Sequence, residues 1–165
     1  MEPTVITRFA VIAAATLALA GCGESEEAKI ETKRYIVVSA IDCADNTGLD
    51  YDRCVKLLQT AVAQHDKTAA TYPKLEACES TEGEGRCERA GEKTYRARVT
   101  AFQLTIGAKT AAVPLYAPTT NKAGLRTAAN DEILPDAETI TFTESAADAS
   151  HFYFKEDPNK RKKRQ

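Results

Sequence analysis

Five cysteines are the residues of this chain whose type and spacing say most about its chemistry. Cys43, Cys54, Cys78 and Cys87 form an even set, which predicts a disulfide framework in an exported protein. Four cysteines allow three connectivities. We favour the two local bridges, Cys43–Cys54 and Cys78–Cys87, because closing such short loops stabilises a domain by roughly 2–3 kcal/mol each in the chain-entropy model.

A metal site is the rival use of these four cysteines. Zinc-binding cysteines normally occur in pairs two to four residues apart, whereas ten residues separate Cys43 from Cys54 and eight separate Cys78 from Cys87. The Cys-x-x-Cys pattern of thioredoxin-like redox enzymes is also absent from the sequence. We therefore predict no metal and no cofactor.

The remaining cysteine, Cys22, ends a short apolar run. Residues 9–20 are apolar apart from Thr16, and at ~1.5 Å per residue they span about 18 Å, well short of a ~30 Å hydrocarbon core. The run therefore reads as the apolar core of a secretory signal peptide. Its end, Leu19-Ala20-Gly21-Cys22, resembles the lipobox of bacterial lipoprotein signals, although an ordinary signal with a chance cysteine is the alternative.

Under the lipobox interpretation, residues 1–21 are a signal peptide and Cys22 is the acylated first residue of the mature protein. Several acyl chains hold a protein far more firmly than one chain does. Residue 23 is Gly rather than Asp, which in similar lipoproteins favours the outer membrane. We therefore expect a lipid-anchored protein of the bacterial cell envelope, on the outer membrane and facing the periplasm.

Charge is segregated along the chain. The whole sequence carries a formal charge of −2, but residues 22–154 hold 15 basic and 21 acidic side chains, about −6, which argues against a nucleic-acid partner. The last eleven residues hold six basic and two acidic side chains. Their basic cluster could bind an anionic envelope polymer, or the tail is simply a solvated terminus; it comprises Lys160, Arg161, Lys162, Lys163 and Arg164.

The sequence contains none of the common catalytic or nucleotide-binding motifs considered next. It contains no G-x-S-x-G elbow, no P-loop and no dinucleotide fingerprint. His65 lies on the apolar face of a predicted helix, where a core or rim role is the common one, and His151 has no recognisable partner. The aspartates around Cys43 and Cys54 lack the ligand spacing of a calcium loop, so we assign them to turns and helix caps. We predict no catalytic residue and no enzymatic activity.

The four cysteines predicted to pair and His65 lie in the front half of the chain, which is predicted to be mainly helical. Residues 35–40 are a candidate for a short strand or an apolar lead-in, and the Asp-, Asn- and Gly-rich stretch 42–54 is expected to be a loop. Residues 51–70 show the spacing of an amphipathic helix capped by Asp50 or Asp52. Its predicted apolar face comprises Leu57, Leu58, Ala61, Val62 and His65. A second short helix is expected over 73–80, opened by Pro73.

The back half favours strands. Residues 94–108 alternate between apolar and polar side chains, with a change of phase near Thr100. Residues 111–118 contain two prolines, which indicates an edge strand or an extended segment, and 137–145 and 151–155 are further short strand candidates. The fold class predicted is a small α+β protein with a disulfide-stapled helical front half and a β-leaning back half. The predicted organisation is a signal peptide (1–21), a lipidated tether (22–34), one exported domain (35–154) and a basic disordered tail (155–165).

Several segments resemble the YgiB-like family of bacterial envelope proteins, which are built around a domain of unknown function. They are Asp42-Cys43 followed ten residues later by Cys54, then AATYPKLEAC (69–78), GEGRC (83–87), VPLY (113–116) and GLRTA (124–128). The family's back half is often rich in Gly, Ser and Gln, unlike this one. The resemblance implies an exported or lipidated envelope protein and implies no reaction.

Two functions remain open from the sequence. The first is a non-enzymatic structural or interaction module, tethered to the membrane by lipid on Cys22 and contacting an envelope protein. The alternative is a module that binds an anionic envelope polymer through its basic tail. Removing residues 159–165 would separate them, because only the second function depends on that charge.

Overall fold

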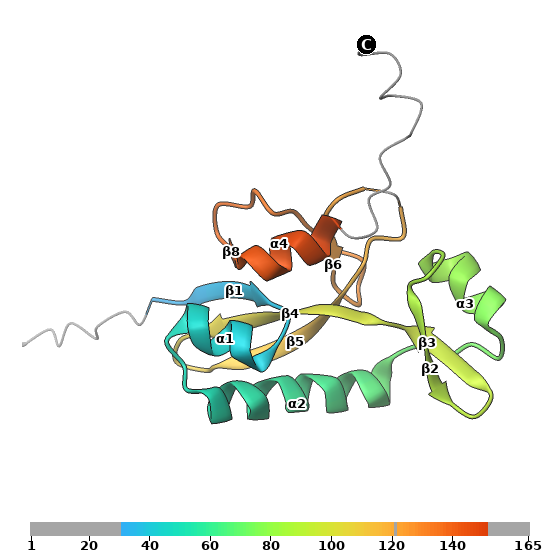
Figure 1. The fold of residues 1–165 in the computed structure, drawn as a ribbon, viewed down its shortest axis with the longest axis horizontal. Coiled ribbons are helices and arrows are strands. Elements are labelled where there is room, and N and C mark those ends of the chain that lie inside the picture. Colours follow the sequence, from blue (N-terminus) through green and yellow to red (C-terminus); the bar gives the residue numbers. More distant parts are fainter. Residues whose placement is uncertain (1–30, 121, 152–165) are drawn as a thin grey trace, which may run out of the picture.

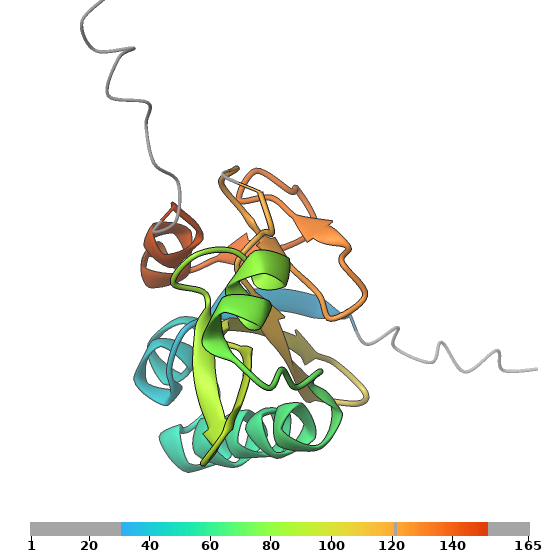
Figure 2. The same ribbon diagram turned by 90° about the vertical axis from the view of Figure 1, so that its right-hand side faces the viewer.

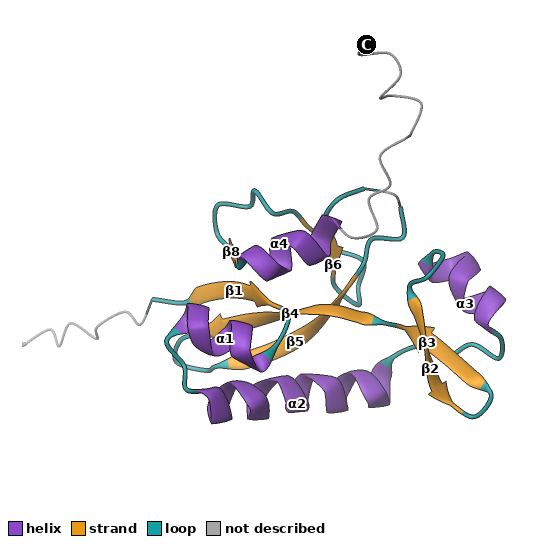
Figure 3. Ribbon diagram, in the orientation of Figure 1, coloured by secondary structure: helices purple, strands orange, loops and turns teal. Residues whose placement is uncertain are grey.

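The computed structural model describes residues 31–120 and 122–151, which form four helices and eight strands. Six strands make the main sheet: β1 (Lys33–Val37), β4 (Val99–Ile106), β5 (Ala111–Tyr116), β6 (Leu125–Arg126), β7 (Glu132–Ile133) and β8 (Thr141–Phe142). Their order is β7-β6-β5-β4-β1-β8, and neighbours are antiparallel except for the parallel pair β1 and β8 (Figures 1 and 3).

Helices cover both faces of this sheet. Helices α1 (Ala40–Thr47) and α2 (Tyr51–Thr68) lie on one face, and α4 (Glu144–His151) lies on the other (Figure 2). Successive residues of a strand point to opposite faces, so Val37 packs under α1 and α2 while Ile36 packs under α4. The sheet therefore separates two apolar clusters: Val37, Cys43, Cys54, Leu58, Ala61, Leu104 and Ala112 on one side, and Ile36, Ala101, Leu115, Leu125, Ile133 and Ala146 on the other.

A smaller unit lies next to the start of β4. It consists of α3 (Leu75–Glu82) and the antiparallel hairpin of β2 (Cys87–Gly91) and β3 (Thr94–Ala97), at the right of Figure 1. A disulfide joins Cys78 of α3 to Cys87 of β2. Tyr72, just before α3, forms a backbone bridge with Tyr95 of β3. The fold is the expected small α+β class, with its disulfides in the helical half.

Helix α1 corrects the prediction of a loop over residues 42–54. The Ser39 hydroxyl accepts a hydrogen bond from the Asp42 amide at 3.1 Å and caps the helix, which ends at Gly48 with φ +75°. The Asp42 carboxylate accepts hydrogen bonds from the Val38 amide and from the Thr143 hydroxyl, both at 2.8 Å. These caps and the tie to Thr143 stabilise a helix in a stretch made of turn-forming residues.

Helix α2 confirms the predicted amphipathic helix. The Asp50 side chain caps it by accepting a hydrogen bond from the Arg53 amide at 2.8 Å, and Leu58, Ala61 and His65 are buried. Val62 was wrongly placed in the core: its side chain is 39% exposed, because it lies on the border of the helix face rather than against the sheet. The second predicted helix begins at Leu75, so Pro73 precedes it instead of opening it.

Strands β4 and β5 confirm two details of the sequence pattern. The register between them shifts from Val99↔Tyr116 to Ala101↔Leu115, which leaves Thr100 as a bulge where the alternation changes phase. Within the described residues, β5 pairs with β6 only through Tyr116, so most of β5 is an edge strand that tolerates its proline.

The strand predicted over 151–155 is wrong at its first residue. His151 ends α4, which starts where the Thr143 hydroxyl accepts a hydrogen bond from the Ala146 amide at 3.1 Å. Three alanines in this stretch favour the helix. Residues 152–155 lie outside the described residues.

Candidate functional site

A buried histidine lies where α2 meets the β2–β3 hairpin and the end of β5. The His65 side chain is 1% exposed and its Nδ1 is 2.9 Å from the hydroxyl of Tyr116. Its Nε2 is 3.6 Å from the Glu88 carboxylate, too far for a hydrogen bond. This geometry favours the tautomer in which Nε2 carries the proton and Nδ1 accepts from Tyr116. We call His65, Tyr116, Glu88, Arg96 and Asp66 the His65 cluster.

Arg96 neutralises the carboxylates of the His65 cluster. Its guanidinium lies 2.8 Å from Glu88 and 2.7 Å from Asp66. Burial lowers the pKa of Arg96, but its hydrogen bonds to Glu88 and Asp66 more than compensate, so the net shift is upward. Burial also lowers the pKa of His65, and the positive charge of Arg96 adds to this effect against the opposing carboxylates. Burial raises the pKa of Tyr116. The pair is therefore a neutral imidazole and a neutral phenol near pH 7.

The depressed pKa of His65 predicts that stability falls in mild acid. The unfolded chain binds a proton on this imidazole near its ordinary pKa of 6.5, whereas the folded protein binds it only at lower pH. The free energy of unfolding should therefore decrease as pH falls below about 6.5, by at most ~1.4 kcal/mol per pH unit for one proton. Thermal melts of the wild type and of His65→Asn between pH 7.5 and 5 measure this, and only the wild type should show the contribution.

His151 supplies the control for this measurement. It is the second of the two histidines in the chain, and it is exposed at the end of α4. His151→Asn should keep the acid-dependent loss of the wild type. Equal pH profiles for the wild type and His65→Asn would show that His65 does not titrate differently in the folded and unfolded states.

A second polar cluster is centred on Arg126. Its guanidinium forms an ion pair with Glu82, donates to the Ala117 carbonyl at 3.0 Å and lies 5.2 Å from the centre of the Tyr116 ring. Glu82 also accepts a hydrogen bond from the Tyr72 hydroxyl at 2.7 Å. Burial and this hydrogen bond raise the pKa of Tyr72. The Arg126 cluster thus links α3, β5 and β6 from the inside.

Four of the five segments that carry the family resemblance contribute a residue to these two clusters or beside them. Tyr72 belongs to AATYPKLEAC, Arg86 to GEGRC, Tyr116 to VPLY and Arg126 to GLRTA. Arg86 donates to the carbonyls of Pro118 and Thr120. The first glycine of GEGRC, Gly83, has φ +105°, and a Cβ there would lie only 2.7 Å from the Arg86 side chain. These motifs therefore build an interior network.

Sequence reasoning did not find this network. It singled out His65 but none of the partners, since Tyr116 is 51 positions away in the chain and the acidic and basic members look like ordinary surface charges. The signal that could have found them is the presence of one Tyr or Arg in each of the four quoted motifs. His65 and Tyr116 are 1% and 5% exposed and lie inside the fold, whereas Glu88 and Asp66 of the same cluster are 33% and 51% exposed.

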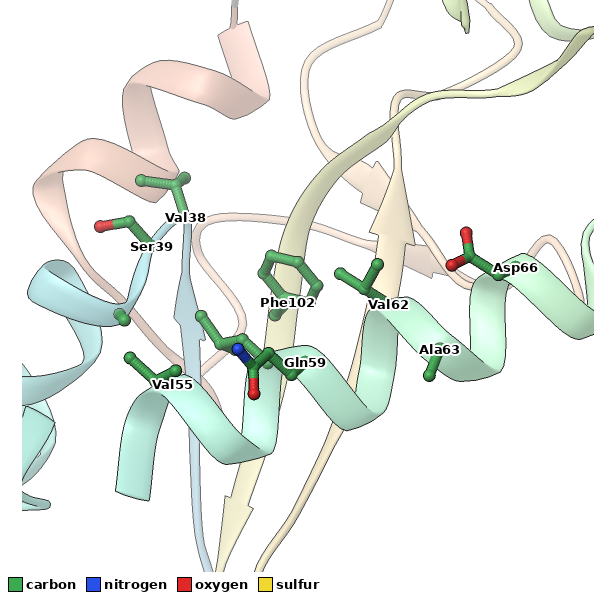
Figure 4. A pocket seen from close by; sticks show the side chains of 10 residues that line it. Val38, Ser39, Val55, Gln59, Val62, Ala63, Asp66 and Phe102 are labelled. Carbon is green, nitrogen blue, oxygen red and sulfur yellow. The ribbon is translucent and has the colours of Figure 1, made fainter. Parts of the chain in front are cut away.

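The surface carries an apolar groove on the α2 side of the sheet. It has a volume of about 410 Å³, within the ~300–1,000 Å³ of ligand pockets. Figure 4 shows Val62 and Phe102 along it, between Val38 at one end and Asp66 at the other. We call it the α2–β4 groove, and its lining comprises Val38, Ser39, Ala40, Val55, Leu58, Gln59, Val62, Ala63, Asp66 and Phe102.

The structure places the predicted site residues in two groups. Cys43 is bonded to Cys54 and Cys78 to Cys87, which are the two local pairings. Cys22 and the basic residues 160–164 lie outside the described residues.

Over 31–120 and 122–151, no three His, Cys, Asp or Glu side chains gather as a metal site. In the same ranges, no helix combines the length and apolar character needed to span a bilayer.

Fold and site together define a small disulfide-stapled α+β domain with a partly buried polar network and an apolar surface groove. The chain belongs to the family described as "Protein of unknown function (DUF1190)", whose model matches residues 31–146. That range includes both disulfides, both polar clusters and the groove. Searches of curated proteins and of solved structures gave no match.

Proposed function

We propose that this chain is a lipid-anchored protein of the bacterial cell envelope, held at the outer membrane and facing the periplasm through Cys22. We further propose that it acts there as a non-enzymatic structural or interaction module, with the α2–β4 groove as its contact surface. Within the family of unknown function, we place it in the YgiB-like group, on the motifs quoted above.

The main support for the proposal is the pairing of four of the five cysteines, which leaves Cys22 without a cysteine partner. The chain has five, and four of them are paired within the domain. No second cysteine in the chain is left to pair with Cys22, which follows an apolar run and the residues Leu19-Ala20-Gly21. Acylation of the thiol is consistent with both facts, and two structural disulfides are typical of an oxidising compartment.

The character of interior and surface supports a non-catalytic role. An acid–base or nucleophilic mechanism needs a side chain that a substrate can reach. His65 and Tyr116, whose pKa values are both shifted by burial, lie inside the fold. The groove, by contrast, offers apolar surface and one charged side chain, Asp66. This combination suits the binding of an apolar segment better than the conversion of a substrate.

Acylation of Cys22 is the direct test. In cells fed a clickable fatty-acid analogue, the wild-type protein should carry the label and sediment with membranes. Cys22→Ala should lose the label and move to the soluble fraction, because the thiol that would carry the acyl chains is gone.

The matched control changes other cysteines. A Cys43→Ser/Cys54→Ser protein loses a disulfide but keeps Cys22, so whatever protein accumulates should still be labelled. Label on Cys22→Ala, or an unlabelled wild type, would contradict the anchor and with it the proposed location.

A further inference from the structure

The few polar side chains of the α2–β4 groove indicate what kind of partner fits it. The lining is apolar apart from Ser39, Gln59 and Asp66. The Ser39 hydroxyl already caps α1 by accepting a hydrogen bond from the Asp42 amide. The exposed side-chain amide of Gln59, by contrast, makes no hydrogen bond to any of the described residues. Gln59 and Asp66 are therefore the polar groups that a partner in the groove has to satisfy.

The Asp66 end of the groove is negatively charged. Asp66 is the single charged residue of the lining, and its side chain is 51% exposed. Arg96 forms ion pairs with both Asp66 and Glu88, so one positive charge faces two negative ones. Because His65 is neutral near pH 7, one negative charge is left uncompensated. A cationic group of a partner is therefore attracted to this end.

The Gln59 amide favours a peptide over an acyl chain as the occupant. An acyl chain in the groove would exclude water from the amide N–H and C=O groups and offer no hydrogen bond in return, which is unfavourable. A peptide backbone carries one donor and one acceptor on each residue other than proline. It can therefore satisfy the amide while its side chains cover the apolar lining.

We propose that the α2–β4 groove binds an extended peptide segment of a partner protein, with alternating apolar side chains and one basic residue. The apolar side chains lie against Phe102 and Val62, the Gln59 amide binds the peptide backbone, and Asp66 pairs with the basic side chain. The inference rests on the proposed function in treating the groove as the contact surface. It deepens that function by naming the chemistry of the partner.

The positions of Gln59 and Asp66 set the spacing of the peptide. They are seven residues apart in α2, nearly two turns, so they lie on one side of the helix about 10 Å apart along its axis, with Val62 between them (Figure 4). Extended residues cover ~3.3–3.6 Å each, so the basic residue lies three positions from the one that Gln59 binds. Since alternate side chains share a face, the pattern is apolar-x-apolar-x-basic in either chain direction.

Two capped heptapeptides test the charge preference. Ser-Leu-Thr-Phe-Thr-Lys-Ser and its reverse carry the pattern in the two chain directions. The protein is the chain from residue 22 onward, with Cys22→Ala to keep it in solution, and the methyl NMR signals of Val62 and Ala63 report occupancy. The tighter peptide should bind at least ~3-fold more strongly than the same peptide with glutamate in place of lysine. Added salt should reduce this ratio.

Two matched pairs of substitutions on α2 locate the contacts, all at exposed positions. Asp66→Asn should remove the preference for lysine, whereas Asp52→Asn, outside the groove lining, should keep it. Gln59→Leu should weaken binding of the peptide, whereas Gln64→Leu, also outside the lining, should not. Thermal melting verifies that the four variants fold.

Other occupants are outcomes of the same titration. Dodecyltrimethylammonium offers an apolar chain and a cation but no peptide backbone. Binding of this probe, with no binding of either heptapeptide, would overturn the inference and assign the groove to a lipid. Val62 and Ala63 signals that change with protein concentration alone would assign it to a second copy of the chain.

The charge and contact results separate this inference from the proposed function. Equal affinity for the lysine and glutamate peptides, or a lysine preference that survives Asp66→Asn, would overturn the inference but leave the groove as a contact surface. If no probe shifts the Val62 and Ala63 signals, both the inference and that contact surface are wrong. None of these results concerns acylation of Cys22, so the envelope anchor is tested separately.

Discussion

Leu58→Asp should unfold the protein at room temperature. Leu58 is 8% exposed and packs with Val37 and Leu104 in the cluster between α2 and the sheet. Truncating a buried leucine to alanine already costs ~2–5 kcal/mol, and burying an uncompensated carboxylate adds to that cost. Because the free energy of unfolding of a domain is only about 5–15 kcal/mol, this one substitution can remove all of it. Circular dichroism and thermal melting measure the result.

Lys56→Asp is the control on the same helix. Lys56 is exposed two positions from Leu58, so replacing it should change the free energy of unfolding by less than ~1 kcal/mol. Similar melting temperatures for the two variants would show that the faces of α2 are misassigned.

Arg126→Met should cost about 3–5 kcal/mol, because it leaves the Glu82 carboxylate without its ion-pair partner in the interior. The side chains of Arg126 and Glu82 are 9% and 12% exposed, so water can solvate neither fully. The substitution also removes the hydrogen bond to Ala117, which holds the chain after β5 against β6. Urea unfolding measures the free-energy change.

A second substitution shows whether the charge is the cause. Glu82→Gln can still accept the hydrogen bond from Tyr72 but carries no charge, so the double variant Arg126→Met/Glu82→Gln should regain part of the lost stability. Arg53→Met, at an exposed position of α2, should leave the free energy of unfolding almost unchanged. Additive effects of the two substitutions at 126 and 82 would contradict a coupled buried pair.

The local pattern of apolar and polar residues was sufficient to predict the long elements of this fold. Helix α2 presents Cys54, Leu58, Ala61 and His65 at spacings of three and four residues, and its Asp50 cap is a local interaction. The bulge at Thr100 was likewise visible as a break in alternation. Each of these features depends on neighbours in the sequence, which is why the sequence predicts it.

Features made by distant residues could not be predicted in this way. Helix α1 consists largely of turn formers and is held by the contact of Asp42 with Thr143, 101 positions later, and by the disulfide from Cys43 to α2. The burial of Val62 depends on how closely α2 approaches β4. The His65 and Arg126 clusters join side chains whose charges, read singly, look like solvated surface.

The disulfide pattern has a consequence for the order in which the chain can be oxidised. Each bridge links consecutive cysteines of the set, at sequence separations of 11 and 9, and loops of ~10 residues close within ~10–100 ns. In a chain that emerges from its N-terminus, Cys43 meets Cys54 before Cys78 is present. Strand β4, whose Phe102 pairs with Val37 of β1, follows later still. The native thiol partners therefore meet in the order of emergence, and maturation requires no disulfide isomerisation.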